Sequence, residues 1–511
     1  MKTPSSFLWQ LIQSLDASEK RYFKRNFLSA KEEAPVYLHL FDAVAAQREY
    51  DEAAILKKYG PRISKKNIAG LKQYLHQLLC EALTTYNKVD DPAHELYYQV
   101  QLIRVYRKKG LIDEAHQVWK KAVKKARQIE SFALLNLLKS EFEKMILSAN
   151  PHTSYDELHS LFRGNVISYP EYAELITLRD IYAETILLKR LGHFDMDTPQ
   201  RDKIKKLLDK AEQYSAAIQS RSFWLRHYYL AITGTLRYLL NRGAEAFTIF
   251  SNLLGDWKES PSFIRSHPEH YIELLHMINY TGVLQGEFAF VENAFNDPCN
   301  ELIRDPVQKA GFEANKYLAL NRIYNKTARY NEVARLLAHM KANLSTWERQ
   351  LNDDMNRTVS LSLGIGSFVM EQLEDAHFYT KRAITYFRDG TREEHAAVAQ
   401  VLLLLITYCM NNARLFDAQY RSTYTYFYKR KKKHPFEAAL VRCLHNTFYQ
   451  TDYRKKVQEY EKALQVFEEN KEDQVQQSTI TIFNYPGWLE SRAQRIPYRH
   501  YVETKVKKQQ R

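Results

Sequence analysis

The stretch LIRVYRKKGLIDEAHQVWKKA, from Leu102 to Ala122, contains two amphipathic segments with a glycine between them. The first segment extends from about residue 94 to residue 109, and Gly110 ends it because glycine readily takes the backbone conformation found at helix C-termini. Asp113 then places a carboxylate at the positive end of a second helix dipole. Ala115, Trp119 and Ala122 follow at i, i+4 and i+7, on one face of that helix. The stretch therefore predicts a hairpin of two packed helices.

The apolar triplet at i, i+4 and i+7 recurs along the chain at an interval of about 43 residues. A period of this length is typical of stacked units rather than of one globular core. At the last two triplets Thr380 and Ser422 replace a large apolar residue, which indicates looser packing or a different register there. The triplets begin at Ala115, Leu158, Ile204, Ala246, Val291, Val333, Ala376 and Ala418, and a weaker ninth begins at Val457.

The first unit resembles a tetratricopeptide repeat (TPR). All six signature positions match that family, namely Leu102, Tyr106, Gly110, Ala115, Trp119 and Ala122, whereas Gln99 replaces the early tryptophan. The resemblance covers residues 91–471 and implies an all-α, right-handed superhelical solenoid of about eight to nine helix pairs. The family's unit is about 34 residues long, so longer helices or connections are expected here. HEAT-like helix pairs, which have a similar period, are the alternative architecture.

The composition supports a helical binding protein. Only 15 Gly and 14 Pro occur in 511 residues, too few for the turns of a large all-β protein. Lys and Arg outnumber Asp and Glu by 74 to 60, and the net charge of +14 suits an acidic peptide, a nucleic acid or an anionic membrane. A soluble protein that is merely basic would show the same balance.

The sequence offers little support for membrane insertion, secretion or catalysis. The most apolar stretch, residues 396–410, is too short to span a bilayer, and no secretory signal begins the chain, so a cytoplasmic location is expected. The four cysteines are far apart, which argues against a zinc cage or a disulfide framework. No phosphate-binding loop is present, and the spacing of His267 and His270 is a weak metal signal. We expect neither enzymatic activity nor a cofactor.

The two ends depart from the repeat. Residues 1–90 read as an N-terminal domain of short helices, either a cap on the solenoid or a helix-turn-helix module with a basic helix between Ile63 and Tyr86 that carries Lys65, Lys66 and Lys72. The cap is the favoured interpretation. Residues 472–511 form a basic C-terminal extension, for which we expect flexibility and a short strand where threonine and isoleucine alternate at residues 479–482.

The resemblance to the TPR family also implies a binding groove. In that family the groove positions lie 15, 11, 8 and 7 residues before the triplet, and basic residues with an asparagine clamp a peptide carboxylate. The positions that carry over are Arg104, Arg107 and Lys108 in the first unit, Tyr238 and Tyr280 in the fourth and fifth, and Arg322, Asn325 and Lys326 in the sixth. They predict non-catalytic binding of a protein or peptide, expected to be acidic.

Two basic clusters favour a second hypothesis, contact with a polyanion. Lys120, Lys121, Lys124 and Lys125 follow one another on the second helix of the first unit, and Lys429, Arg430 and Lys431 follow a tyrosine-rich stretch. A regulator could then contact nucleic acid through these clusters and its N-terminal helices while the solenoid senses a peptide. The same lysines could simply stabilise helix C-termini. The sequence does not predict the oligomeric state.

Overall fold

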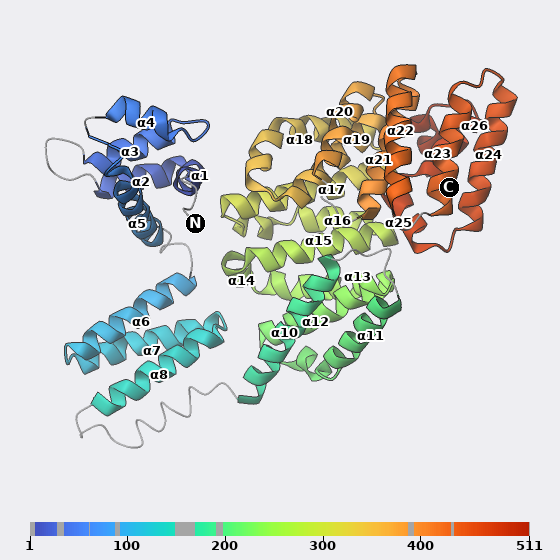
Figure 1. Cartoon of the computed structure of the whole chain (residues 1–511). Coiled ribbons are helices and arrows are strands. Elements are labelled where there is room, and N and C mark those ends of the chain that lie inside the picture. Colours follow the sequence, from blue (N-terminus) through green and yellow to red (C-terminus); the bar gives the residue numbers. More distant parts are fainter. Residues whose placement is uncertain are drawn as a thin grey trace. The chain divides into compact units, whose positions relative to one another are not determined.

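The computed structural model describes residues 6–27, 35–60, 62–86, 92–148, 169–190, 198–386, 393–430 and 434–509. Within these ranges the regular structure is helical, and no strand occurs. The chain divides into two compact units, Met1–Asn165 and Val166–Arg511 (Figure 1). The prediction of an all-α fold is confirmed, whereas the domain boundaries after residues 90 and 471 remain predictions.

The first unit contains eight described helices. They are α1 (Ser6–Ser14), α2 (Ala17–Phe27), α3 (Val36–Ala45), α4 (Glu52–Tyr59), α5 (Ile68–Tyr86), α6 (Pro92–Lys108), α7 (Ile112–Gln128) and α8 (Phe132–Ser148). Helices α1 to α5 share one apolar core, in which Ile12, Leu40, Val44 and Leu75 are fully buried. The N-terminal stretch is therefore a small helical bundle.

Helices α6, α7 and α8 form the first repeat and the helix that covers it. Gly110 has a φ of 76°, in the left-handed region that favours glycine, and lies between α6 and α7 as predicted. Ala115, Trp119 and Ala122 are at most 2% exposed. The Trp119 indole donates a hydrogen bond to the Leu138 carbonyl of α8 at 2.8 Å. The predicted helix hairpin is confirmed.

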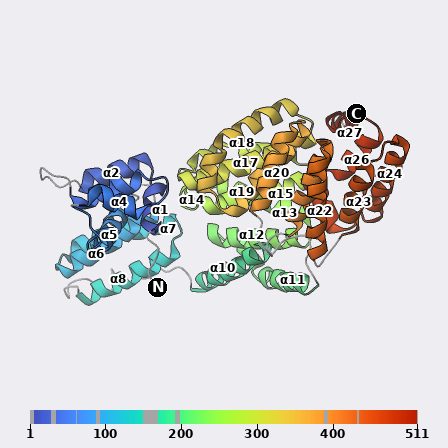
Figure 2. The ribbon, with the colours of Figure 1, turned by 45° about the horizontal axis from the view of Figure 1, so that its top comes forward.

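The second unit is a stack of helix pairs (Figures 1 and 2). The first helices of successive pairs contact one another in the order α10, α12, α15, α17, α19, α21, α23, and each also packs on its own second helix. This arrangement is a TPR-like solenoid, as the resemblance implied. The helices are α10 (Tyr169–Arg190), α11 (Thr198–Glu212), α12 (Phe223–Leu239), α13 (Gly243–Glu259), α14 (Pro261–Ser266), α15 (Pro268–Gln285), α16 (Phe288–Phe295), α17 (Pro306–Lys326), α18 (Tyr330–Gln350), α19 (Asp353–Val369), α20 (Leu373–Thr385), α21 (Glu393–Cys409), α22 (Ala413–Lys429), α23 (Pro435–Phe448), α24 (Tyr453–Glu469), α25 (Gln474–Ile482), α26 (Tyr485–Ala493) and α27 (Tyr498–Gln509), with short 3-10 helices η2 (Ser215–Gln219) and η3 (Pro298–Leu302).

The predicted triplets explain how the paired helices pack. The first residues of five triplets, Ile204, Ala246, Val291, Val333 and Ala376, are all 0% exposed. Glycines on the preceding helices closely face the second residues of two triplets, Phe250 and Thr380. A Cβ added at Gly234 would lie 2.8 Å from the Phe250 ring, and one at Gly364 would overlap the Thr380 hydroxyl. Small residues on one helix thus let the second helix approach closely. The triplet at Leu158 lies outside the described residues.

The predicted triplets at Ala418 and Val457 are in the wrong register. Ala418 is exposed, whereas Phe416 and Thr423 on the same helix, α22, are fully buried. The face that packs therefore begins two residues earlier, because the Phe416 ring stacks on Phe448 with centroids 4.0 Å apart. On α24, Tyr460, Ala463 and Phe467 are buried, and Val457 is only half-buried.

The expectation of a flexible extension with a short strand is wrong. Residues 474–482 form helix α25, whose first turn is capped by the Asp473 carboxylate accepting from the Gln476 amide at 2.9 Å. The next aromatic residues, Phe483, Tyr485 and Trp488, are at most 3% exposed, and the Tyr485 hydroxyl donates to the Val398 carbonyl of α21 at 3.1 Å. Burial of these rings stabilises helices where the local alternation favoured a strand.

The helices and the cysteines bear on membrane insertion and on disulfide bonding. Across the described ranges, no helix combines the length and the apolar character that crossing a bilayer requires. All four cysteines are free thiols, and Cys443 is buried.

Candidate binding site in the second unit

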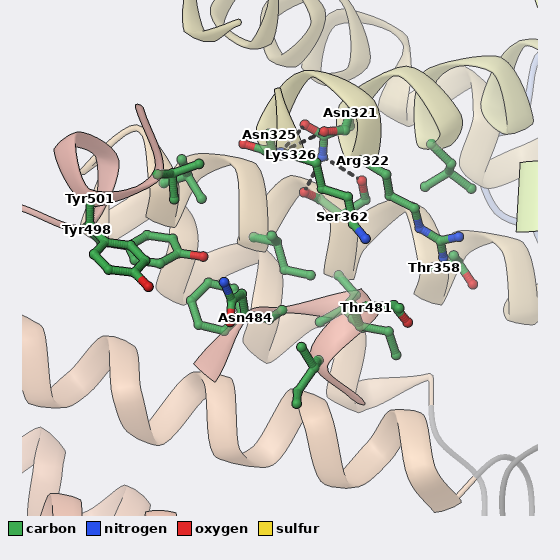
Figure 3. A pocket seen from close by; sticks show the side chains of 18 of the residues that line it. Asn321, Arg322, Asn325, Lys326, Thr358, Ser362, Thr481, Asn484, Tyr498 and Tyr501 are labelled. Atoms are coloured by element: carbon green, nitrogen blue, oxygen red, sulfur yellow. Dashed lines mark hydrogen bonds between the residues drawn. The ribbon is translucent and has the colours of Figure 1, made fainter. Parts of the chain in front are cut away.

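A cavity of about 410 Å³ lies between α17 and α19 on one side and α25 and α27 on the other (Figure 3). Its walls include three basic residues, Arg322 and Lys326 of α17 and Lys505 of α27. No Asp or Glu is among the described residues that line it. The cavity is therefore a basic recess between the repeat helices and the C-terminal segment.

One face of helix α17, with a leucine and polar or basic residues, lines the cavity. Leu318, Arg322, Asn325 and Lys326 follow at i, i+4, i+7 and i+8, which places them along the same side of a helix. The helix starts with Pro306, and the Asp305 carboxylate caps it by accepting from the Gln308 amide at 2.8 Å. The sequence thus fixes both the start of the helix and the face that carries the basic residues.

A network of amides orders the floor of the cavity. Asn321 is 2% exposed, and its side-chain amide donates to the carbonyl and the hydroxyl of Ser362 at 2.9 and 2.7 Å. Asn325 donates to the carbonyl and side-chain oxygens of Asn321 at 2.8 and 2.9 Å (Figure 3). The Oδ1 atom of Asn325 is itself buried and accepts no hydrogen bond. A ligand that carries a donor could satisfy it.

The electrostatics of the cavity favour an anion. Desolvation lowers the pKa of Lys326, and the positive charge of Arg322 lowers it further. On the opposite wall, Lys505 lies 3.5 Å from the Glu490 carboxylate. An anionic group in the cavity would offset the repulsion between Arg322 and Lys326 and would stabilise the charged ammonium group.

The row of predicted groove residues continues from this cavity along the inner helices. The Arg322 guanidinium lies over the Tyr280 ring of α15, 5.0 Å from its centroid. The Tyr280 ring in turn lies 6.3 Å from the Tyr238 ring of α12. The structure therefore brings together five predicted positions, Tyr238, Tyr280, Arg322, Asn325 and Lys326. Tyr238 is only 6% exposed, so it supports the row more than it offers surface to a ligand.

The predicted groove residues of the first unit have intramolecular partners. Glu141 of α8 is fully buried, and its carboxylate accepts from Arg104 at 2.9 Å and from Lys144 at 3.0 Å. Arg107 approaches the same carboxylate at 3.9 Å. Lys108 is exposed. Arg104 and Arg107 thus balance a buried charge, a role that sequence reasoning missed because Glu141 lies on another helix.

The predicted polyanion clusters are only partly available at the surface. Lys120, Lys121 and Lys124 are exposed on α7, and Lys125 pairs with Glu95.

In the second cluster Lys429 is exposed, and Lys431 lies outside the described residues. The prediction that Arg430 contacts a polyanion is wrong. Its guanidinium is buried and donates to both oxygens of Glu437 at 2.9 and 3.0 Å. Since a buried carboxylate needs a paired cation, Arg430 serves the fold rather than a polyanion.

The N-terminal helices show no basic face along α5. Lys65 and Lys66 are exposed but precede the helix, which starts at Ile68 and not near Ile63 as predicted. Lys72 forms an ion pair with Glu52 and lies over the Tyr50 ring, 5.1 Å from its centroid. Two of the three lysines expected on a recognition helix therefore lie outside it, and the third has a partner.

Sequence reasoning missed the second wall of the cavity. Tyr498, Tyr501, Val502 and Lys505 follow at i, i+3, i+4 and i+7 on α27, a helical pattern in a segment that was expected to be flexible.

In the described ranges, no group of three or more His, Cys, Asp or Glu side chains is arranged to hold a metal ion.

Comparisons with known proteins find similarity of fold. No protein-family model and no curated protein sequence matches the chain. Solved structures that resemble it include a Rap protein complexed with competence and sporulation factor (12% identity, 81% of this chain and 98% of that one, TM-score 0.46) and apo RapI (13%, 81% and 98%, 0.44). A third is a STAND signal-transduction ATPase with a tetratricopeptide repeat sensor from Pyrococcus horikoshii (12%, 88% and 68%, 0.39). These values concern the helical backbone alone.

Proposed function

We propose that the second unit is a non-catalytic binding module that holds a protein or peptide by an anionic group. The observation that carries this proposal is the charge of the 410 Å³ cavity, which has Arg322, Lys326 and Lys505 in its walls and no acidic lining residue. Charge-assisted hydrogen bonds to a carboxylate are among the stronger polar contacts, and an arginine can make two at once.

The cavity and the row of groove residues beside it would hold different parts of the ligand. The volume of 410 Å³ accommodates the end of a peptide or one to two side chains. The remaining ligand would extend along Tyr280, which stacks on Arg322 and gives a rigid, amphipathic contact surface. Because the Oδ1 atom of Asn325 accepts no hydrogen bond and Arg322 and Lys326 line the same wall, the site suits a carboxylate that is next to an N–H donor, as at a peptide C-terminus.

The test is a peptide panel in which each sequence is made as the free acid and as the C-terminal amide, with binding measured by fluorescence anisotropy. We expect the acids to bind at least about 10-fold more tightly, because each charge-assisted hydrogen bond contributes roughly 1.5–3 kcal/mol. Arg322→Gln combined with Lys326→Gln should remove that preference. Lys309→Gln, an exposed lysine on the same helix, is the matched control. Equal binding of acids and amides would contradict the proposal.

Contact with a nucleic acid is the second candidate, and one observation favours it. Lys120, Lys121 and Lys124 are exposed together on one side of α7. If they bind phosphates, replacing all three with Gln should weaken binding to a duplex and reduce its salt dependence in an electrophoretic mobility assay. An unchanged salt slope would exclude this surface.

A further inference from the structure

A second cavity, of about 690 Å³, lies in the same unit among the ends of α19, α21, α23 and α26 and the starts of α24 and α27. Val369 and Tyr498 border both cavities, but the remaining walls differ. Four cations line this second cavity, and they are Lys456, Arg492, Arg495 and Arg499. The single acidic lining residue is Glu371, which is exposed.

Aromatic rings, rather than carboxylates, hold Arg492 and Arg495 in place. The Arg492 guanidinium lies over the Trp488 ring at 5.2 Å, and that of Arg495 lies over the Tyr453 ring at 3.5 Å. Within the described residues, neither arginine has a carboxylate partner, whereas Arg499 lies 3.5 Å from Glu503. A ring face orients a guanidinium without neutralising it, so the cavity keeps its positive charge.

Two buried donors at the cavity wall lack a strong acceptor. Trp488 is 0% exposed, and its Nε1 atom and the Nε atom of Arg492 are both buried without a hydrogen-bond partner of good geometry. The neighbouring polar group is the thiol of Cys409, a weak acceptor, to which Arg492 donates through Nη2 at 3.3 Å. An unsatisfied buried donor costs about 1–3 kcal/mol, and an oxygen from a ligand would offset that cost.

A purely structural role explains only part of this arrangement. Helices α19, α21 and α26 end at the cavity, and cations stabilise the negative end of a helix dipole. That role accounts for the positive charge. It accounts neither for the volume nor for the two buried donors that lack a strong acceptor.

We propose that this cavity binds a small phosphate ester. The phosphate group would lie among Lys456, Arg492 and Arg495, because a dianion with three terminal oxygens can accept from several cationic donors at once. The apolar body of the ester would contact Phe448 and Ile496 on the same walls. The volume lies in the range of small-molecule sites. This inference does not depend on peptide binding in the first cavity.

Isothermal titration calorimetry of the full chain tests the proposal with four probes, namely phenyl phosphate, inorganic phosphate, phenol and a phosphotyrosine peptide. We expect phenyl phosphate to bind with 1:1 stoichiometry and a Kd below about 1 mM, inorganic phosphate to bind about 10-fold more weakly, and phenol not to bind. Arg492→Gln combined with Arg495→Gln should weaken phenyl phosphate at least about 10-fold. Arg454→Gln, exposed on α24 and outside the cavity, should leave it unchanged.

Four results would overturn the proposal. They are the absence of phenyl phosphate binding, equal binding of phenol, unchanged affinity in the double variant, and tighter binding of a phosphotyrosine peptide, which would assign the site to a phosphoprotein instead of a small molecule. If circular dichroism shows that the double variant is unfolded, Lys456→Gln replaces it, since Lys456 has no ion pair within the described residues. That variant should weaken phenyl phosphate at least about threefold, and no change would equally exclude the site.

Discussion

Single residues set how closely the paired helices approach. Gly364 of α19 faces Thr380 of α20 so closely that any side chain would overlap the Thr380 hydroxyl and approach its backbone nitrogen at 3.1 Å. Gly255 of α13 has no such neighbour within 4 Å. The two glycines are therefore expected to respond to substitution in opposite directions.

Gly364→Ala should destabilise the second unit by roughly 1–3 kcal/mol, the usual cost of overpacking. Gly255→Ala should stabilise it by about 0.5–1 kcal/mol, because alanine has the higher helix propensity. Urea unfolding followed by circular dichroism measures both. A Gly364→Ala variant as stable as the wild type would show that the helices can separate without loss.

A buried histidine pair gives the second unit a dependence on pH. His227 Nε2 lies 3.4 Å from His270 Nδ1, and His227 is only 2% exposed. Burial lowers the pKa of His270 to about 4 and lowers that of His227 well below its ordinary value, and the charge of neighbouring histidines adds to both shifts. Both side chains are therefore neutral in the folded protein near neutral pH.

The sign of the pH effect follows from proton binding. Between pH 6.5 and about 4 the unfolded chain binds more protons at His270 than the folded protein does. The contribution of His270 to the free energy of unfolding is therefore complete above pH 6.5 and is lost as the pH is lowered. His270 alone should reduce it by about 2 kcal/mol between pH 7.5 and pH 5. Urea unfolding at the two pH values measures this change. His270→Phe should reduce the difference, and an equal difference in that variant would assign it to other groups.

At the scale of elements, the turns between paired helices repeatedly use the left-handed backbone region without glycine. Asn241, Ala328, Glu371 and Asn411 all have φ between 51° and 62°. The turn after α17 is closed by the Arg329 amide donating to the Tyr324 carbonyl at 2.9 Å, and the turn after α12 has the equivalent bond from Arg242 to Arg237. Alanine is poorly suited to this conformation, whereas asparagine tolerates it.

Ala328→Gly should therefore stabilise the second unit by about 0.5 kcal/mol, because the relief of backbone strain exceeds the entropy lost on ordering a glycine. Asn241→Gly should be close to neutral. Thermal unfolding of the two variants side by side measures the difference. A loss of stability in Ala328→Gly would show that packing of the Ala328 methyl group outweighs the strain.

The elements that could be predicted from sequence are those whose signals are local. The hairpin of α6 and α7 follows from Gly110 and the buried triplet after it. The register of α22 could not be predicted, because Ala418 fits the period while the stacking of Phe416 on Phe448 decides the packing. The prediction of a strand within α25 failed for the same reason, since contacts with distant helices override a local alternation.

The candidate site was predictable on one side only. Arg322, Asn325 and Lys326 follow from their spacing before Val333 and from the TPR resemblance. The opposite wall, with Tyr501 and Lys505, belongs to no repeat and comes into place only through tertiary packing. Arg104 and Arg430 have the residue type expected of a ligand contact, but the buried partners Glu141 and Glu437 lie on separate helices.

At the scale of the whole molecule, each compact unit has its own apolar core. A fragment comprising residues 166–511 should therefore fold alone, with one cooperative thermal transition that coincides with a transition of the full chain. Differential scanning calorimetry of both proteins measures this. A fragment without a cooperative transition would show that the second unit needs the first.

The C-terminal segment also determines when the first cavity can exist. The Tyr330 hydroxyl donates to the Arg499 carbonyl at 3.2 Å across 169 residues of chain, and α27 supplies one wall of the recess that α17 begins. During synthesis α17 leaves the ribosome long before α27, and at about 5–20 residues per second the interval is many seconds. In that interval Arg322 and Lys326 face solvent without their opposite wall. The nascent protein would therefore acquire its complete recess only after α27 has been synthesised.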